Sequence, residues 1–179
     1  MDPFQYVCMY VCMIIGTGRR SHIREFAALV RVVQLAHGLG IFHRDISISN
    51  IFYGEEGECI FLNDWSSAHC TTTAAAKPSH RFSSSSGSAA GNSVKWVGTR
   101  YFSCSKADEN MNHVPTAADD LRSLVKCAQI SYCNQPTPLP GTEERYFECE
   151  IMQDSYWRKA WDLAGNSEYQ ALVEHFERP

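Results

Sequence analysis

The side chains best suited to chemistry lie in one short stretch, HRDISISN, at residues 43–50. It carries a carboxylate at Asp45 and, five residues later, a carboxamide at Asn50. A second carboxylate, Asp64, follows two short apolar segments. Carboxylate and amide oxygens are ligands that Mg²⁺ accepts, and a carboxylate can also take a proton from a hydroxyl. If the three side chains converge, they can hold a divalent cation beside a reacting hydroxyl group.

The alternative interpretation of these residues is structural. Asp and Asn favour loops because their side chains bond nearby backbone groups, so Asp45 and Asn50 would form an Asx-type loop between a helix and a strand. Asp64 would then be a turn residue at the end of a strand. We favour the functional interpretation because further motifs follow in a fixed order.

Three further motifs follow: LNDWS at residues 62–66, VGTRY at 97–101 and DDLRSL at 119–124. Together with HRDISISN they resemble the C-lobe of the protein kinase superfamily. HRDISISN resembles the H-R-D-x-x-x-x-N catalytic loop, and the later motifs resemble the D-F-G triplet, the Gly-Thr-x-x-Tyr end of the activation segment and the start of the long buried helix. Trp65 and Ser66 depart from Phe and Gly, and one residue fewer separates Thr from Tyr.

The resemblance implies an α+β fold: a protein-kinase-like C-lobe, mainly α-helical, with a small β-hairpin and a residual N-lobe hinge strand. HRDIS followed by Asn-Ile resembles fungal-type protein kinases, whereas GTRY with DDLxSL gives casein-kinase-like features; we favour the fungal-type group. We expect one partial kinase-like domain over residues 1–179, with the N-lobe remnant and hinge at 1–18 and the C-lobe at 19–179. Residues 66–97 are expected to form a mobile activation-segment-like loop.

The same resemblance implies roles for individual residues. Asp45 is the catalytic residue that accepts or orients the proton of the substrate hydroxyl, and Asn50 and Asp64 bind Mg²⁺ on the phosphates of ATP. The remaining implied residues bind adenine or support the catalytic loop: Ile14, Ile15 and Gly16 in the hinge, and His43, Arg44, Thr99 and Asp120 around the loop.

Three supporting residues leave alternatives open. We interpret His43 as a packing residue whose imidazole bonds the backbone, and not as a base. Arg44 suits either a phosphorylated residue of the Ser/Thr-rich loop or an ordinary ion pair. Asp120 is either a helix-start carboxylate stabilised by the helix dipole or a buried anchor for the loop backbone, and we favour the anchor.

The sequence pattern also predicts the elements that position these residues. Apolar residues recur at helical spacing over residues 21–37, and Gly38 is a suitable stop. Apolar segments at 51–53 and 59–62 flank GEEGE, which predicts a β-hairpin. Residues 66–93 are rich in Ser, Thr, Ala and Gly, which predicts a loop.

Three helices are predicted in the second half of the chain. Thr116 and Asp119 form a capping pattern for the first, and Ser167 with Gln170 form one for the last. The middle helix runs through residues 156–161. The inward-facing residues are expected to be Leu121, Leu124, Val125 and Ala128, then Tyr156, Trp157, Ala160 and Trp161, then Tyr169, Leu172, Val173 and Phe176.

Composition narrows the class of protein. The 179 residues are 44 % hydrophobic and 20 % charged, as in one globular domain, and the net charge of -4 offers no basic surface for nucleic acid. Eight cysteines without a CxxC pair indicate a reduced, intracellular chain, cytoplasmic or nuclear, with zinc as a minority alternative. The apolar run at 4–15 is too short to span a membrane, so we expect no membrane partner.

Several kinase features are not matched. No Gly-rich loop or V-A-I-K lysine precedes the expected hinge, and GTGRRS at 16–21 lacks the third glycine, so we interpret it as hinge or turn. Ser47 stands where Ser/Thr kinases carry lysine, and no Ala-Pro-Glu follows Tyr101. We therefore expect ATP·Mg²⁺-dependent phosphoryl transfer to Ser or Thr of proteins, with feeble activity in the isolated chain.

The alternative function is a catalytically inactive kinase fragment or pseudokinase that acts as a binding module. A small-molecule phosphotransferase is a third, less favoured interpretation. Either of the first two implies a protein as substrate or docking partner. Because a strand at residues 4–15 would expose an unpaired apolar edge, we also expect self-association through it.

Overall fold

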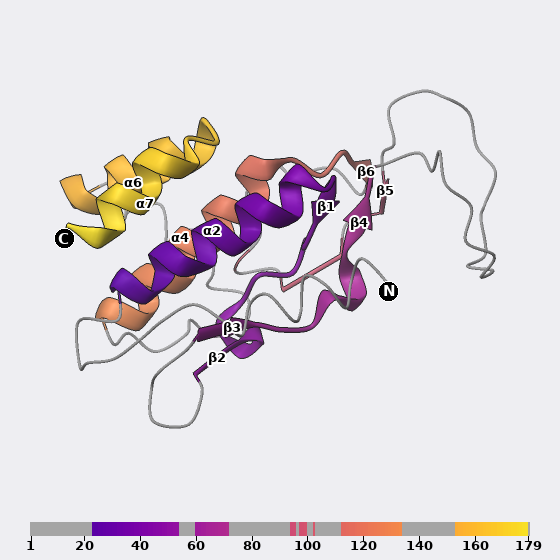
Figure 1. The fold of residues 1–179 in the computed structure, drawn as a ribbon, viewed down its shortest axis with the longest axis horizontal. Helices are drawn as coiled ribbons and strands as arrows, with labels where there is room; N and C mark the ends of the chain where they lie inside the picture. Colours follow the sequence, from indigo (N-terminus) through magenta and orange to yellow (C-terminus); the bar gives the residue numbers. More distant parts are fainter. Residues whose placement is uncertain are drawn as a thin grey trace.

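The computed structural model describes residues 23–53, 60–71, 94–95, 97–99, 102, 112–133 and 153–178. Within these ranges the helices are α2 (Ile23–Gly38), α4 (Ala117–Cys133), α6 (Ser155–Gly165) and α7 (Tyr169–Glu177). α2 packs against α4 and α7, and α6 packs against α4 and α7. Figure 1 shows α2 and α4 crossing the centre of the molecule, with α6 and α7 gathered toward one end. None of these helices is long and apolar enough to cross a membrane.

Three short antiparallel strand pairs accompany the helices in the described part of the chain. β1 (Ile41–Phe42) pairs with β4 (His69–Cys70), β2 (Ile51–Tyr53) with β3 (Ile60–Leu62), and β5 (Val94–Lys95) with β6 (Asn112–His113). In the β2–β3 pair Ile51 faces Leu62 and Tyr53 faces Ile60, so the predicted hairpin is confirmed. Short 3₁₀ turns, η1 (Ile48–Asn50) and η3 (Trp65–Ser67), adjoin this hairpin.

The region predicted as a loop, residues 66–97, is only partly a loop. β4 and β5 lie within it, because each finds a partner strand elsewhere in the chain. Strands of two residues are too short to show the alternating pattern from which strands are predicted. Residues 72–93 and the predicted hinge strand at 4–15 lie outside the described residues.

The helix starts agree with the prediction at α4 and differ from it at α7. Asp119 Oδ2 accepts hydrogen bonds from the Thr116 N–H and hydroxyl, both at 2.8 Å, which is the predicted cap. The capping box predicted at Ser167 is wrong: α7 begins at Tyr169, and Gln170 bonds within the helix instead. Ser167 has a left-handed backbone, with φ 57°, whereas an N-cap residue needs an extended one.

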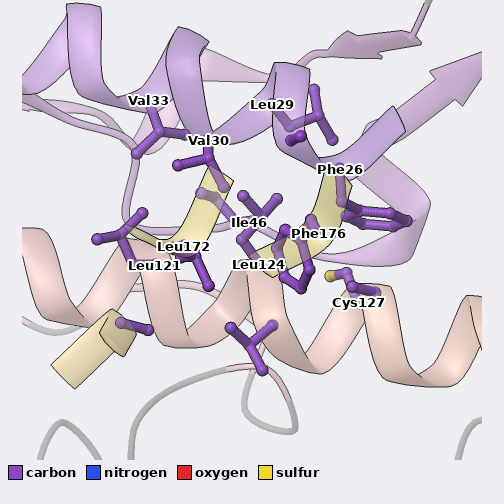
Figure 2. Close-up of a cluster of buried hydrophobic side chains, with 14 of the residues drawn as sticks. Phe26, Leu29, Val30, Val33, Ile46, Leu121, Leu124, Cys127, Leu172 and Phe176 are labelled. Carbon is purple, nitrogen blue, oxygen red and sulfur yellow. The ribbon is translucent and has the colours of Figure 1, made fainter. Parts of the chain in front are cut away.

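The hydrophobic core lies between the helices and includes one residue of the HRDISISN loop. Figure 2 shows Ile46 among side chains of α2 and α4, where it is 1 % exposed. The surrounding core residues include Phe26, Leu29, Val30 and Val33 of α2, Leu121, Leu124 and Cys127 of α4, and Leu172 and Phe176 of α7. Burying an aliphatic side chain of this size contributes roughly 1.5–3 kcal/mol. Burial of Ile46 therefore stabilises the position of the loop at residues 43–50 against the helices.

Candidate functional site

Residues 43–50 connect β1 to β2 and carry the candidate site. Ile46 is buried, whereas its neighbour Asp45 and the later Asn50 are partly exposed. Arg44 has a left-handed backbone, with φ 72°, and so turns the chain sharply just before Asp45. The loop thus has one side in the core and a polar side at the surface.

Asp120, in the first turn of α4, holds the backbone of this loop. Its Oδ2 accepts the His43 N–H at 2.7 Å, and its Oδ1 accepts the Arg44 N–H at 2.8 Å. The carboxylate is only 3 % exposed, so these donors replace the water that it loses on burial. A hydrogen bond to a charged group contributes about 1.5–3 kcal/mol. The structure therefore places Asp120 as a buried anchor beneath residues 43 and 44.

Asp45 is oriented by Thr99 of the VGTRY motif. Its Oδ1 accepts two hydrogen bonds from Thr99, one from the N–H at 2.7 Å and one from the hydroxyl at 2.9 Å. Gly98, with φ 127°, permits this approach, since a Cβ there would lie 2.5 Å from the Arg44 carbonyl oxygen. Within the described residues no donor contacts Oδ2 of Asp45, and the residue is partly exposed.

Asn50 is bonded back to the same loop. Its Nδ2 donates to the Asp45 carbonyl oxygen at 2.9 Å, and its own carbonyl accepts the Asn63 N–H at 2.8 Å. The first bond fixes which way the carboxamide points and leaves its oxygen on the opposite side. The second bond brings the segment carrying Asp64 against the end of the loop.

Asp64 follows β3 in a left-handed conformation, with φ 57° and ψ 66°. Its Oδ1 accepts the Ser66 hydroxyl at 2.6 Å and the Ser66 N–H at 3.4 Å. The hydroxyl bond, followed by the backbone bond, lowers the pKa of Asp64 below its ordinary value. The carboxylate is exposed, so at neutral pH it is an ionised, accessible oxygen donor.

His43 contacts both the loop and the segment that follows the hairpin. Its Nε2 lies 3.0 Å from the Asn63 carbonyl oxygen, and its Nδ1 accepts the Asp45 N–H at 3.3 Å, so the proton resides on Nε2. The ring also packs on Trp65, with centroids 4.5 Å apart. Burial lowers the pKa of His43, although the nearby charges of Asp120, Asp45 and Asp64 oppose that shift. His43 is thus a neutral link between loop and hairpin.

An ordinary ion pair was one of the two contacts expected of Arg44, and no described residue forms it. Its guanidinium donates to the Ser67 carbonyl at 3.3 Å and to the Lys95 carbonyl. These carbonyls belong to η3 and β5, and among the described residues no carboxylate bridges to the side chain of Arg44. The phosphorylated partner stays a prediction.

Comparison with known proteins identifies the architecture. No protein-family model and no curated protein matches this sequence. The structure, however, is similar to that of the Cydia pomonella granulovirus kinase PK-1, with a TM-score of 0.57 and 14 % sequence identity over 87 % of this chain. The chain has a protein-kinase-like fold. It spans 57 % of the length of the viral kinase chain, and its α+β arrangement is that of a kinase-like C-lobe, as predicted.

The donor set of this kinase-like C-lobe suits Mg²⁺ better than zinc. Asp64 offers a carboxylate and Asn50 an amide oxygen, and Mg²⁺ is commonly bound by one or two such groups while phosphates and water complete its shell. Within the described residues no cluster of three or more His, Cys, Asp or Glu side chains could hold a metal ion, so nothing there supports the zinc alternative. Ile14, Ile15 and Gly16, the expected adenine contacts, lie outside the described residues.

Sequence reasoning missed some residues that build the candidate site. Ser66 was noted only as a departure from glycine, yet its hydroxyl bonds Asp64. Gly98 was part of a motif, but its close approach to Arg44 depends on a fold-level contact. His37 was assigned only to a helix, although its Nε2 lies 2.9 Å from Asp120 Oδ2. A histidine in the last turn of the helix before the loop was the available signal.

Proposed function

We propose that this chain is the C-lobe of a protein kinase that transfers the γ-phosphoryl group of ATP to serine or threonine hydroxyls of proteins. One observation carries the proposal: Thr99 holds Asp45 through Oδ1, no described residue bonds Oδ2, and buried Asp120 holds the backbone of the same loop. A carboxylate fixed in this way is suited to orienting a hydroxyl and taking its proton.

In the proposed reaction Asp45 aligns the substrate hydroxyl, whose oxygen attacks the γ-phosphorus as the bond to the departing ADP oxygen breaks. The hydroxyl proton passes to Oδ2 of Asp45. Asn50 and Asp64 would hold Mg²⁺, which neutralises charge on the phosphates when bound. The hinge residues Ile14, Ile15 and Gly16 remain the proposed contacts of adenine.

The finer classification rests on motifs. The motif GTRY resembles the end of a kinase activation segment, and its Thr99 bonds the candidate catalytic carboxylate. This supports serine or threonine, rather than another residue type, as the phosphate acceptor. HRDIS followed by Asn-Ile supports the fungal-type group.

We propose that activity of this chain alone is feeble. Ser47, which replaces the usual lysine, is fully buried, and its hydroxyl bonds Ser49 at 2.8 Å, so it brings no cation to a phosphate. Loss of one preorganised charge-stabilising donor typically slows a reaction by roughly a hundred- to thousandfold.

The test is transfer of radiolabelled phosphate from ATP·Mg²⁺ to a generic serine-rich protein, comparing the chain with Asp45→Asn. Asp162→Asn is the matched control, because Asp162 is exposed on α6. The proposal predicts that Asp45→Asn lowers the rate roughly a hundred- to thousandfold while the control leaves it unchanged. Equal labelling by all three proteins would contradict it and favour the non-catalytic binding module.

A further inference from the structure

The buried anchor Asp120 is itself held by a side chain from outside the catalytic motifs. His37, in the last turn of α2, has its Nε2 2.9 Å from Asp120 Oδ2, the oxygen that also accepts the His43 N–H at 2.7 Å. The His37 and Asp120 side chains are only 5 % and 3 % exposed. If His37 moved away from Asp120, water could therefore take its place only after the surrounding structure rearranged.

The other ring nitrogen of His37 is bonded to the C-terminal helix. His37 Nδ1 lies 2.7 Å from the Tyr169 hydroxyl, at the start of α7. Because a carboxylate can only accept, Nε2 must carry a proton to bond Asp120, and in the neutral ring Nδ1 then accepts the Tyr169 O–H. Burial, together with the charge of Asp120, raises the pKa of Tyr169, so the hydroxyl keeps its proton.

The ring of His37 is held in place by two further aromatic contacts. Its centroid lies 4.9 Å from that of Phe42, the residue just before the candidate catalytic loop, and 5.9 Å from that of Tyr169. The imidazole thus lies between β1 and α7. α2 and α7 also pack directly against each other, so a change in the docking of α7 would move Tyr169 relative to His37.

We propose that Tyr169 is a positioning residue for the loop at residues 43–50. Its hydroxyl fixes the tautomer and orientation of His37, which in turn donates to Asp120 and keeps both Asp120 oxygens aligned with the His43 and Arg44 amides. The packing of α7 thereby determines how firmly the loop carrying Asp45 is held. Only the consequence for catalysis rests on the proposed function; the structural link stands apart from it.

The test compares Tyr169→Phe with Tyr156→Phe in the full chain. Each variant removes one hydroxyl from a partly buried tyrosine, and the Tyr156 hydroxyl bonds the His175 carbonyl at 3.1 Å, remote from Asp120 in the hydrogen-bond network. Amide hydrogen exchange, followed by NMR, reports the protection of His43 and Arg44. The Leu124 amide in the core corrects for global stability.

In Tyr169→Phe the His43 and Arg44 amides should exchange roughly 3- to 10-fold faster relative to Leu124, whereas in Tyr156→Phe their relative rates should not change. Equal relative changes in both variants would overturn the proposal. Should Tyr169→Phe fail to fold, ¹⁵N shifts of the His37 ring in the unmodified chain decide instead. The proposal requires the proton on Nε2, and a proton on Nδ1 alone would overturn it.

The measurement needs no nucleotide. A chain that transfers no phosphate can still show the selective loss of protection, and an active chain can fail to show it. The two proposals therefore succeed or fail separately.

Discussion

At the base of the candidate site, Asp120 is 3 % exposed and its two oxygens accept bonds from His43, Arg44 and His37. At the outer edge, Asp64 is exposed and bonds only Ser66 within the described residues. The base is fixed by burial and by contacts distant in sequence, whereas the edge is fixed by a local turn. The base is therefore held by the protein's own groups, whereas Asp64, which is expected to meet a cation, is exposed.

The largest effect should come from removing the buried anchor. Asp120→Ala leaves two backbone N–H groups and His37 without their acceptor, and we expect a loss of roughly 3–5 kcal/mol in the free energy of unfolding. Urea denaturation measures it. Asp162→Ala, on the exposed face of α6, should change stability by less than about 0.5 kcal/mol. Comparable losses in the two variants would remove the distinction between base and surface.

A smaller effect is expected where the VGTRY segment meets the loop. Gly98→Ala would place a Cβ 2.5 Å from the Arg44 carbonyl at a φ of 127°, so we expect a loss of about 1–3 kcal/mol in the free energy of unfolding. Gly38→Ala is the control, since nothing lies within 4 Å of a Cβ there. Thermal unfolding of both variants checks this. Equal stability of Gly98→Ala and Gly38→Ala would show that Gly98 is not packed closely against the Arg44 carbonyl.

The smallest effect should come from the exposed edge. Ser66→Ala removes the hydroxyl bond to Asp64, which is the largest cause of its lowered pKa, and keeps the backbone N–H bond, so the pKa of Asp64 should rise toward its ordinary value. A depressed carboxyl pKa stabilises the fold above the unfolded pKa of about 4 and loses this contribution as the pH falls through the folded value. The stability difference between the variants should therefore be present at pH 6 and vanish in acid. A carboxyl titration by NMR that showed no change in pKa would contradict the assignment.

Elements that depend on local signals could be predicted from the sequence, whereas contacts between residues distant in the chain could not. The hairpin and the helix at Ala117–Cys133 were predictable because their signals are local: two apolar segments that flank a turn-forming sequence, and a cap with its partner three residues away. The family resemblance indicated Asp120 and Thr99 as partners of the loop. Neither the contact of Thr99 with Asp45, 54 residues apart, nor that of His37 with Asp120, 83 apart, has a local signal that fixes its geometry.

Other differences have equally specific causes. The two-residue strands β4 and β5 form because each pairs with a strand distant in the chain. They are too short to show a periodic pattern in the sequence. Ser167 has the composition of a helix cap, but its left-handed backbone delays the start of α7 to Tyr169. Arg44 was expected to meet either a phosphorylated residue or an ordinary ion-pair partner; among the described residues its guanidinium donates to backbone carbonyls of two later segments, and the phosphorylated partner stays a prediction.

The central proposal is that Asn50, in the loop at residues 43–50, and Asp64, after the β2–β3 hairpin, bind the same cation. Adding Mn²⁺ with ATP in place of Mg²⁺, and recording the paramagnetic broadening of amide NMR signals, tests it most directly. We predict that the Asn50 and Asp64 amides broaden together at low Mn²⁺, ahead of Asp162 on α6, and that Asp64→Asn abolishes the broadening at both. Broadening at one of the two without the other, or broadening of Asn50 that survives Asp64→Asn, would contradict the account.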